Sequence, residues 1–182
     1  MSEKWSLWKR NVVDKYKNWP TDAIRRDLQE TANPFSVCME HWQGDFNIST
    51  LIRNANAFNA EKVFYLGKKR FDRRGTVAVD NNISNTHKLG EFDWLSLEKP
   101  PLMLFGEEGV GLTAAALKIA DYSIEIPQYG SVRSLNVGTS SGILMYDFVR
   151  SLESSKVAHR WQIKTHGENE NAPNEPCQLT LL

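Results

Sequence analysis

The chain has 182 residues and a mass of 20.8 kDa, a length that suits one domain with appendages. Hydrophobic residues make up 41% of it and charged residues 24%; these are ordinary values for a folded protein and exclude disorder as the main state. No apolar run reaches the about 18 residues that a membrane span needs. The amino terminus does not have the pattern of a secretory signal. Cys38 and Cys177 lie far apart in sequence, which argues against a disulfide scaffold or a cysteine-rich zinc site, and we expect a cytoplasmic protein.

Charge gives two different indications. The chain has 22 basic and 22 acidic residues, and this zero net charge lends no support to nucleic-acid binding. Residues 68–74, however, read KKRFDRR, a strongly basic stretch. On charge alone, a solvated loop and a phosphate-binding loop explain this stretch about equally well.

Residues 1–32 are predicted to form a helical arm. Apolar side chains recur at helical spacing over residues 5–19, and Pro20 then interrupts the pattern. Thr21 or Asp22 can cap a second short helix. The arm can contact RNA or cover a dimer, and the sequence favours neither role.

Short apolar runs alternate with helical patterns over residues 33–155. This alternation predicts an α/β fold with a mostly parallel sheet flanked by helices. The polar segment 156–182 is predicted to be a flexible tail. Strands are predicted at 35–40, 63–67, 101–105 and 122–127, and helices at about 48–58 with Asn47 as N-cap, 92–99, 114–120 with Thr113 as N-cap, and about 136–152.

Two predicted strands are followed by loops of unusual composition. Ligands of open parallel sheets bind outside the carboxyl ends of the strands, and GEEGVGL follows the strand at 101–105. Its glycines let the backbone approach a ligand closely, although a plain tight turn needs them equally. Their spacing does not fit G-x-G-x-x-G, which disfavours a nucleotide-dependent oxidoreductase. The second loop, QYGSVRSLNVG, follows the strand at 122–127.

A third segment, NISTLIRNANAF, places Asn47 and Arg53 near the start of a predicted helix. A surface salt bridge would be the commoner role for a lone arginine there. Taken together, NISTLIRNANAF, LMLFGEEGVGL and IEIPQYGSVRSLNVG resemble the three ordered motifs of the SpoU-type (TrmH-like) RNA 2′-O-ribose methyltransferases of the SPOUT superfamily. The resemblance covers roughly residues 35–150.

This resemblance implies a deep carboxyl-terminal trefoil knot, a homodimer, S-adenosyl-L-methionine as cofactor and no metal. It implies cofactor contacts at Gly106, Ile126 and Leu135. It implies polar active-site positions at Asn47, Arg53, Glu108, Ser134 and Asn136. RNA binding is predicted for the basic residues Lys68, Lys69, Arg70, Arg73 and Arg74, close to the expected site.

Two features depart from the family pattern. Phe58 is followed by Asn59, where the family has a small residue, and the last helix begins with the looser sequence Gly138-Thr-Ser-Ser-Gly142. These departures affect expected packing more than chemistry. The dimer is expected to use an apolar face of that helix, made of Ile143, Leu144, Tyr146 and Phe148.

The function implied is methyl transfer to a ribose 2′-hydroxyl of RNA. We expect tRNA rather than rRNA, because no separate substrate-binding domain precedes the motifs. In the family, the arginine at the position of Arg53 is proposed as the general base. A guanidinium seldom loses its proton, so we favour a bidentate phosphate clamp. The alternative function is a non-catalytic RNA-binding protein that retains the knotted fold.

Overall fold

The computed structural model describes residues 12–40, 45–67, 85–107, 111–132, 134–154 and 178–181. Its contacts divide the chain into two compact units, residues 1–32 and residues 33–182. Each unit has its own internal packing, and the second carries all three motifs. Within the described ranges, no helix combines the length and the apolar character that crossing a membrane requires.

The first unit contains the 3₁₀ turn η1 (Asp14–Tyr16) and helix α2 (Thr21–Glu30). Asp27 of α2 accepts hydrogen bonds from the ammonium of Lys15, at 2.7 Å, and from the hydroxyl of Tyr16. These two donors lower the pKa of the Asp27 carboxyl. The predicted cap at Thr21 or Asp22 is wrong: Pro20 is the N-cap residue and no side chain caps α2. Of the predicted first helix, residues 1–11 lie outside the described residues.

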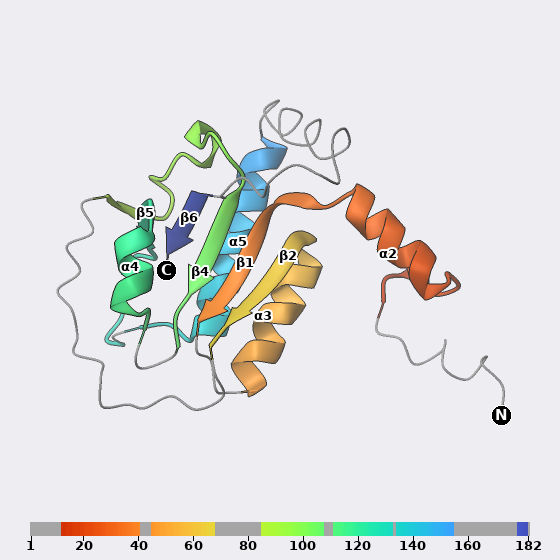
Figure 1. Cartoon of the computed structure of the whole chain (residues 1–182), viewed down its shortest axis with the longest axis horizontal. Helices are drawn as coiled ribbons and strands as arrows, with labels where there is room; N and C mark the ends of the chain where they lie inside the picture. Colours follow the sequence, from red (N-terminus) through yellow and green to blue (C-terminus); the bar gives the residue numbers. More distant parts are fainter. Residues whose placement is uncertain are drawn as a thin grey trace. The chain divides into compact units, whose positions relative to one another are not determined.

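Strand β1 (Asn33–Glu40) runs through the sheet interior, and residues 34–40 are all buried. A strand covered on both faces needs such a continuous apolar run. The sheet is parallel at every pairing, as the alternation of strands and helices predicts (Figure 1). Its strand order is β2 (Ala60–Leu66), β1, β4 (Pro101–Phe105), β6 (Gln178–Leu181), β5 (Tyr122–Glu125) and β3 (Thr86–Lys88).

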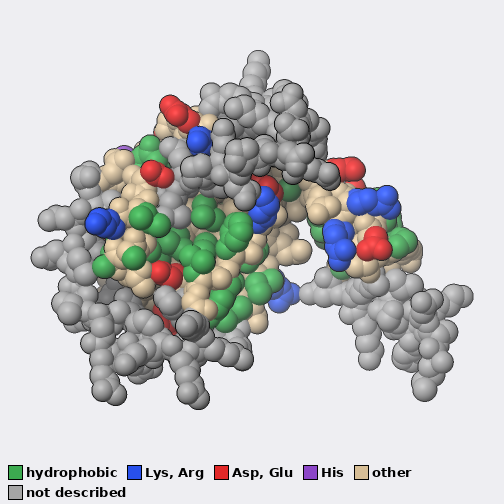
Figure 2. Space-filling view, in the orientation of Figure 1, with side chains coloured by type: hydrophobic (Ala, Val, Ile, Leu, Met, Phe, Trp, Pro, Cys, Tyr) green, Lys and Arg blue, Asp and Glu red, His purple; other side chains and the backbone are tan. Residues whose placement is uncertain are grey.

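The two faces of the sheet carry different helices. Alternate β1 side chains, Phe35, Val37 and Met39, join the main core with residues of α3 (Asp45–Ala57) and α5 (Val137–Glu153). Cys38 points to the other face, where it packs with Ala116 of α4 (Ala114–Ile119). Figure 2 views this α4 side, where hydrophobic side chains gather over the middle of the sheet.

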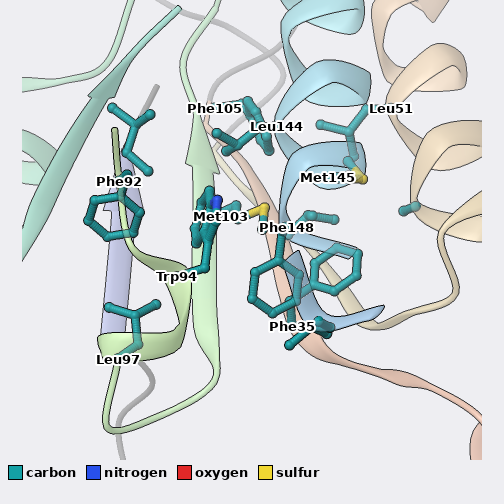
Figure 3. Close-up of a cluster of buried hydrophobic side chains, with 14 of the residues drawn as sticks. Phe35, Leu51, Phe92, Trp94, Leu97, Met103, Phe105, Leu144, Met145 and Phe148 are labelled. Atoms are coloured by element: carbon teal, nitrogen blue, oxygen red, sulfur yellow. The ribbon is translucent and has the colours of Figure 1, made fainter. Parts of the chain in front are cut away.

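Aromatic rings form the centre of the main core (Figure 3). Trp94, in the 3₁₀ turn η3 (Trp94–Ser96), packs edge-on against Phe148 of α5 at 5.3 Å between ring centroids. Phe148 in turn packs against Phe35 of β1 at 5.2 Å. The indole N–H of Trp94 donates to Asp147 at 2.9 Å, so the buried ring has a partner for its one polar atom.

The structure corrects several predictions made from the sequence. Helix α3 begins at Asp45, so Asn47 lies in its first turn and is not its N-cap. The predicted helix at 92–99 is reduced to the η3 turn, and the short strand β3 was not predicted. The flexible tail predicted for 156–182 does not extend to its end, because residues 178–181 form β6 inside the sheet.

Candidate active site

Two of the three motifs meet at a hydrogen bond between asparagines. Asn47, in the first turn of α3, accepts from the side-chain amide of Asn136 at 2.9 Å. Asn136 is also the N-cap of α5, because its side-chain oxygen accepts from the backbone N–H of Thr139 at 3.2 Å. The side-chain amide of Asn136 therefore caps α5 and also binds a residue of α3. Both predicted active-site asparagines are half-buried and held in place by this contact.

Helices α3 and α5 approach each other closely beside this contact. A Cβ on Gly138 would lie 2.8 Å from the methyl carbon of Thr50, which is shorter than van der Waals contact. Asn54 of α3 donates to the carbonyl of Gly138 at 2.9 Å and to the hydroxyl of Ser141 at 3.1 Å. The Gly138–Gly142 segment departs from the family pattern in sequence. In the structure it is the surface of α5 on which α3 packs.

The glycine loop after β4 closes tightly on itself. The N–H of Gly111 donates to the carbonyl of Glu107 at 2.8 Å, and Gly111 has a φ of +75°, which favours glycine. A Cβ on Gly106 would overlap the backbone of Gly111 and Leu112. Gly106 is therefore required by the path of the chain, whatever ligand the loop binds.

The structure adds a buried carboxylate next to this loop, which the sequence analysis did not predict as part of the site. Glu40, the last residue of β1, is 8% exposed. Its two oxygens accept from the backbone N–H of Thr113 at 2.9 Å and from the hydroxyl of Thr113 at 2.6 Å. The sequence shows a glutamate at the end of a strand, but nothing in it marks Thr113, 73 residues away, as its partner.

The same carboxylate affects a neighbouring thiol. Burial raises the pKa of Cys38 to about 11, and the negative charge of Glu40 adds to the rise. Cys38 is 1% exposed. A thiol that stays protonated and covered is a poor nucleophile, so Cys38 has a packing role here, as the sequence indicated.

The loop between β5 and α5 carries the other predicted cofactor residues. Ile126 and Leu135 are half-buried, and Ser134 is exposed. Tyr129, in the same loop, is 96% exposed. This loop and the glycine loop both leave the sheet at carboxyl ends of parallel strands, the edge at which open α/β sheets bind ligands.

The cationic part of the predicted site is only partly described. Arg53 is exposed on α3, and no hydrogen bond or ion pair is assigned to it within the described ranges. Glu108 and the predicted RNA-binding residues 68–74 lie outside the described residues. Among those residues that are described, no group of three or more His, Cys, Asp or Glu could hold a metal ion.

The predicted dimer face on α5 is wrong as an exposed surface. Leu144 and Phe148 are fully buried in the core of their own chain. Tyr146 is 58% exposed and packs at a tilt against Phe58 of the same chain, at 6.3 Å between ring centroids. Leu144 and Phe148 are four residues apart and share a helix face, whereas Tyr146 is two residues from each of them and lies on the opposite side.

This arrangement defines a class of protein, the parallel α/β proteins whose ligand loops gather at the carboxyl edge of the sheet. The model of the SpoU rRNA methylase family matches residues 75–146. A tRNA (guanosine(18)-2′-O)-methyltransferase of Aquifex aeolicus is 26% identical over 166 residues, which cover 75% of this chain and 79% of that protein. The Escherichia coli K12 enzyme of the same name is 27% identical and covers 66% of this chain. This chain spans 65% of that enzyme, just under two thirds.

A solved structure shares the fold. It is the SpoU methyltransferase AviRb from Streptomyces viridochromogenes in complex with the cofactor AdoMet. It matches with a TM-score of 0.50 at 19% identity, and the match covers 71% of this chain and 62% of that one. The chain is thus similar to the SpoU rRNA methylase family over residues 75–146.

Proposed function

We propose that the protein is an S-adenosyl-L-methionine-dependent RNA 2′-O-ribose methyltransferase that acts on tRNA in preference to rRNA. The observation that carries the proposal is the hydrogen bond from Asn136 to Asn47, which joins two motifs that lie 89 residues apart in the sequence. The names of the Aquifex aeolicus and Escherichia coli relatives support both the reaction and the choice of tRNA.

The residues at the strand ends suit an adenosyl cofactor. Gly106 and Gly111 bring backbone groups together without side chains, and Ile126 and Leu135 offer half-buried apolar surface. Backbone donors and acceptors beside apolar side chains are what a pocket for a small, uncharged base needs. When bound, S-adenosyl-L-methionine supplies a methyl group already activated by its sulfonium.

The chain's own task is then to orient the ribose and to stabilise charge. Holding two reactants in line can contribute about 7–11 kcal/mol toward such a barrier. Arg53 is exposed on α3, six residues after Asn47, and can bind the phosphate beside the target ribose with both arms of its guanidinium. A fixed cation there stabilises the developing alkoxide, and a substrate phosphate can accept the proton.

Three further parts of the proposal rest on the family resemblance. They are a trefoil knot formed by the segments that carry motifs two and three, a homodimer, and RNA binding by the basic residues 68–74. The competing function, RNA binding without catalysis, predicts no affinity for the cofactor, so calorimetry with S-adenosylhomocysteine separates the two.

Single-turnover methyl transfer with saturating RNA tests the role of Arg53. Arg53→Ala should lower the rate by about 100- to 1,000-fold, the usual effect of losing one preorganised charge contact, and leave cofactor affinity nearly unchanged. Arg53→Lys should recover little, because the planar fork is lost.

The matched control is Arg150→Ala. Arg150 is an exposed arginine paired with Asp147 at 3.0 Å, about 20 Å along α5 from its amino end. Its loss should leave the rate unchanged. An Arg53→Ala variant that methylates at the wild-type rate would remove Arg53 from the site. An Arg53→Ala variant that also fails to bind cofactor would make its role structural.

A further inference from the structure

Glu40 is a buried carboxylate whose two oxygens both serve one partner. The backbone N–H and the hydroxyl of Thr113 donate to it at 2.9 and 2.6 Å. Hydrogen bonds to an ionised acceptor are shorter and about twice as strong as neutral ones. Burying a carboxylate without hydrogen-bond partners is costly. The Glu40–Thr113 pair is therefore a specific buried contact and not an incidental surface contact.

Thr113 is fixed on its other side as well. Its hydroxyl oxygen accepts from the backbone N–H of Ala116 at 3.2 Å and so caps α4. The hydroxyl therefore donates in one direction and accepts in the other. Both the backbone and the χ1 rotamer of Thr113 are set by these contacts, and the chain that leads into Thr113 has little freedom at this end.

That chain is the return end of the glycine loop. Gly111 and Leu112 immediately precede Thr113, and their backbone lies where a Cβ of Gly106 would be. The departing end of the loop is fixed because β4 pairs with β1 through Phe105, opposite Met39. Glu40 follows Met39 directly. One strand, β1, thus holds the departing end through its backbone and the returning end through its last side chain.

We propose that Glu40 is a positioning residue that holds the return end of the glycine loop in the shape that accepts the adenosyl cofactor. The inference rests on the proposed function. It adds a residue that acts through Thr113 and touches neither cofactor nor RNA. It also explains why the buried strand β1 ends in a carboxylate.

Calorimetric binding of S-adenosylhomocysteine to the full-length chain tests the proposal. Glu40→Ala should raise the Kd by about 10- to 100-fold, as expected when both bonds to a charged acceptor are lost. Glu40→Gln can rebuild both contacts, because its amide oxygen accepts the N–H of Thr113 and its amide nitrogen donates to the hydroxyl. It should bind within about threefold of wild type. Thr113→Ser should also bind as wild type does.

The control variant is Val37→Ala, on the same strand but facing the other side of the sheet, in the main core. It should lower the melting temperature through a cavity while leaving the Kd unchanged. Thr113→Val removes the hydroxyl that donates to Glu40 and should raise the Kd as well. It keeps the proposal testable even if Glu40→Ala does not fold. The double variant Glu40→Ala/Thr113→Val should bind no more weakly than Glu40→Ala, because the two side chains act as one unit.

Several results would overturn the inference. Wild-type affinity in both Glu40→Ala and Thr113→Val would do so. The inference would also fail if Val37→Ala and Glu40→Ala had the same melting temperature and lost the same affinity. The effect of Glu40→Ala would then be general destabilisation. The failure of the proposed function looks different, since wild-type protein itself would then show no binding at millimolar cofactor.

Discussion

Gly138→Ala tests the close approach of α3 and α5. The new Cβ would lie 2.8 Å from the methyl carbon of Thr50 and 3.0 Å from its Cβ, whereas carbon atoms pack best at about 3.5–4.0 Å. The helices must therefore separate by several tenths of an ångström. Overpacking of this kind costs about 1–3 kcal/mol, and the better helix propensity of alanine returns up to about 1 kcal/mol.

The expected net effect is a loss of about 1–2 kcal/mol in the free energy of unfolding. For a chain of this size, that lowers the melting temperature by roughly 2–8 °C. Gly142→Ala is the comparison, because the atoms nearest to its new Cβ belong to the side-chain amide of Asn54, the first at 3.1 Å. This distance is longer than the 2.8 Å at Gly138, so the loss there should be smaller, although a shift of the amide would lengthen its bonds to Gly138 and Ser141.

Thr50→Ser removes the methyl carbon but keeps a hydroxyl, which in wild type donates to the carbonyl of Phe46 at 2.9 Å. Thermal unfolding of Gly138→Ala, Thr50→Ser and the double variant gives their coupling. The double variant should recover part of the stability lost by Gly138→Ala. A Gly138→Ala variant at or above the wild-type melting temperature, or no recovery in the double variant, would refute the packing argument.

Three further predictions concern single side chains. Asn136→Asp keeps the oxygen that caps α5 but loses the amide that donates to Asn47; it should fold nearly as stably as wild type and lose methyl transfer, whereas Asn136→Ala should also lose about 1 kcal/mol of stability. If Asn136→Asp keeps full activity, the asparagine pair has no catalytic importance. Gly106→Ala should abolish cofactor binding in calorimetry, since its Cβ overlaps backbone that cannot move cheaply; unchanged binding would show that the loop can open. In a Cys177→Ser background, alkylation of native Cys38 should accelerate only as pH approaches about 11. An unfolded thiol ionises near pH 9.0, so the stability contributed by the neutral Cys38 should be complete below pH 9 and fall between pH 9 and 11, relative to Cys38→Ser. Fast alkylation at pH 8 would contradict its burial.

Periodicity was enough to predict the parts of the fold whose signal is local. β1 and β4 are short, mostly apolar runs and α5 is a long helical pattern, and each lies within a few residues of its predicted place. The cap at Thr113 was also predictable, because capping depends on neighbouring residues only.

The wrong predictions depend on tertiary context. β6 is a four-residue strand at the end of a polar segment, and only its place between β4 and β5 makes it part of the sheet. Asn47 is not an N-cap, because α3 begins at Asp45, and its side chain accepts instead from Asn136, 89 residues away. On α5, counting apolar residues without their angular positions merged a buried face with an exposed one.

The candidate site shows the same division between local and distant information. Motif order brought Asn47, Gly106 and Asn136 into the predicted site. The contacts that fix their geometry are pairs far apart in sequence, Glu40 with Thr113 and Asn54 with Gly138. No local pattern in one sequence identifies such pairs.

The central claim is tested most directly by methyl transfer from labelled S-adenosyl-L-methionine. Purified protein would be incubated with unmodified total tRNA and, separately, with rRNA, and the RNA then digested to nucleosides. We predict label in a 2′-O-methylated nucleoside, more from tRNA than from rRNA, and label that appears about 100- to 1,000-fold more slowly with Arg53→Ala. Label on a base instead of a ribose, or no label from folded protein that binds the cofactor, would contradict the account.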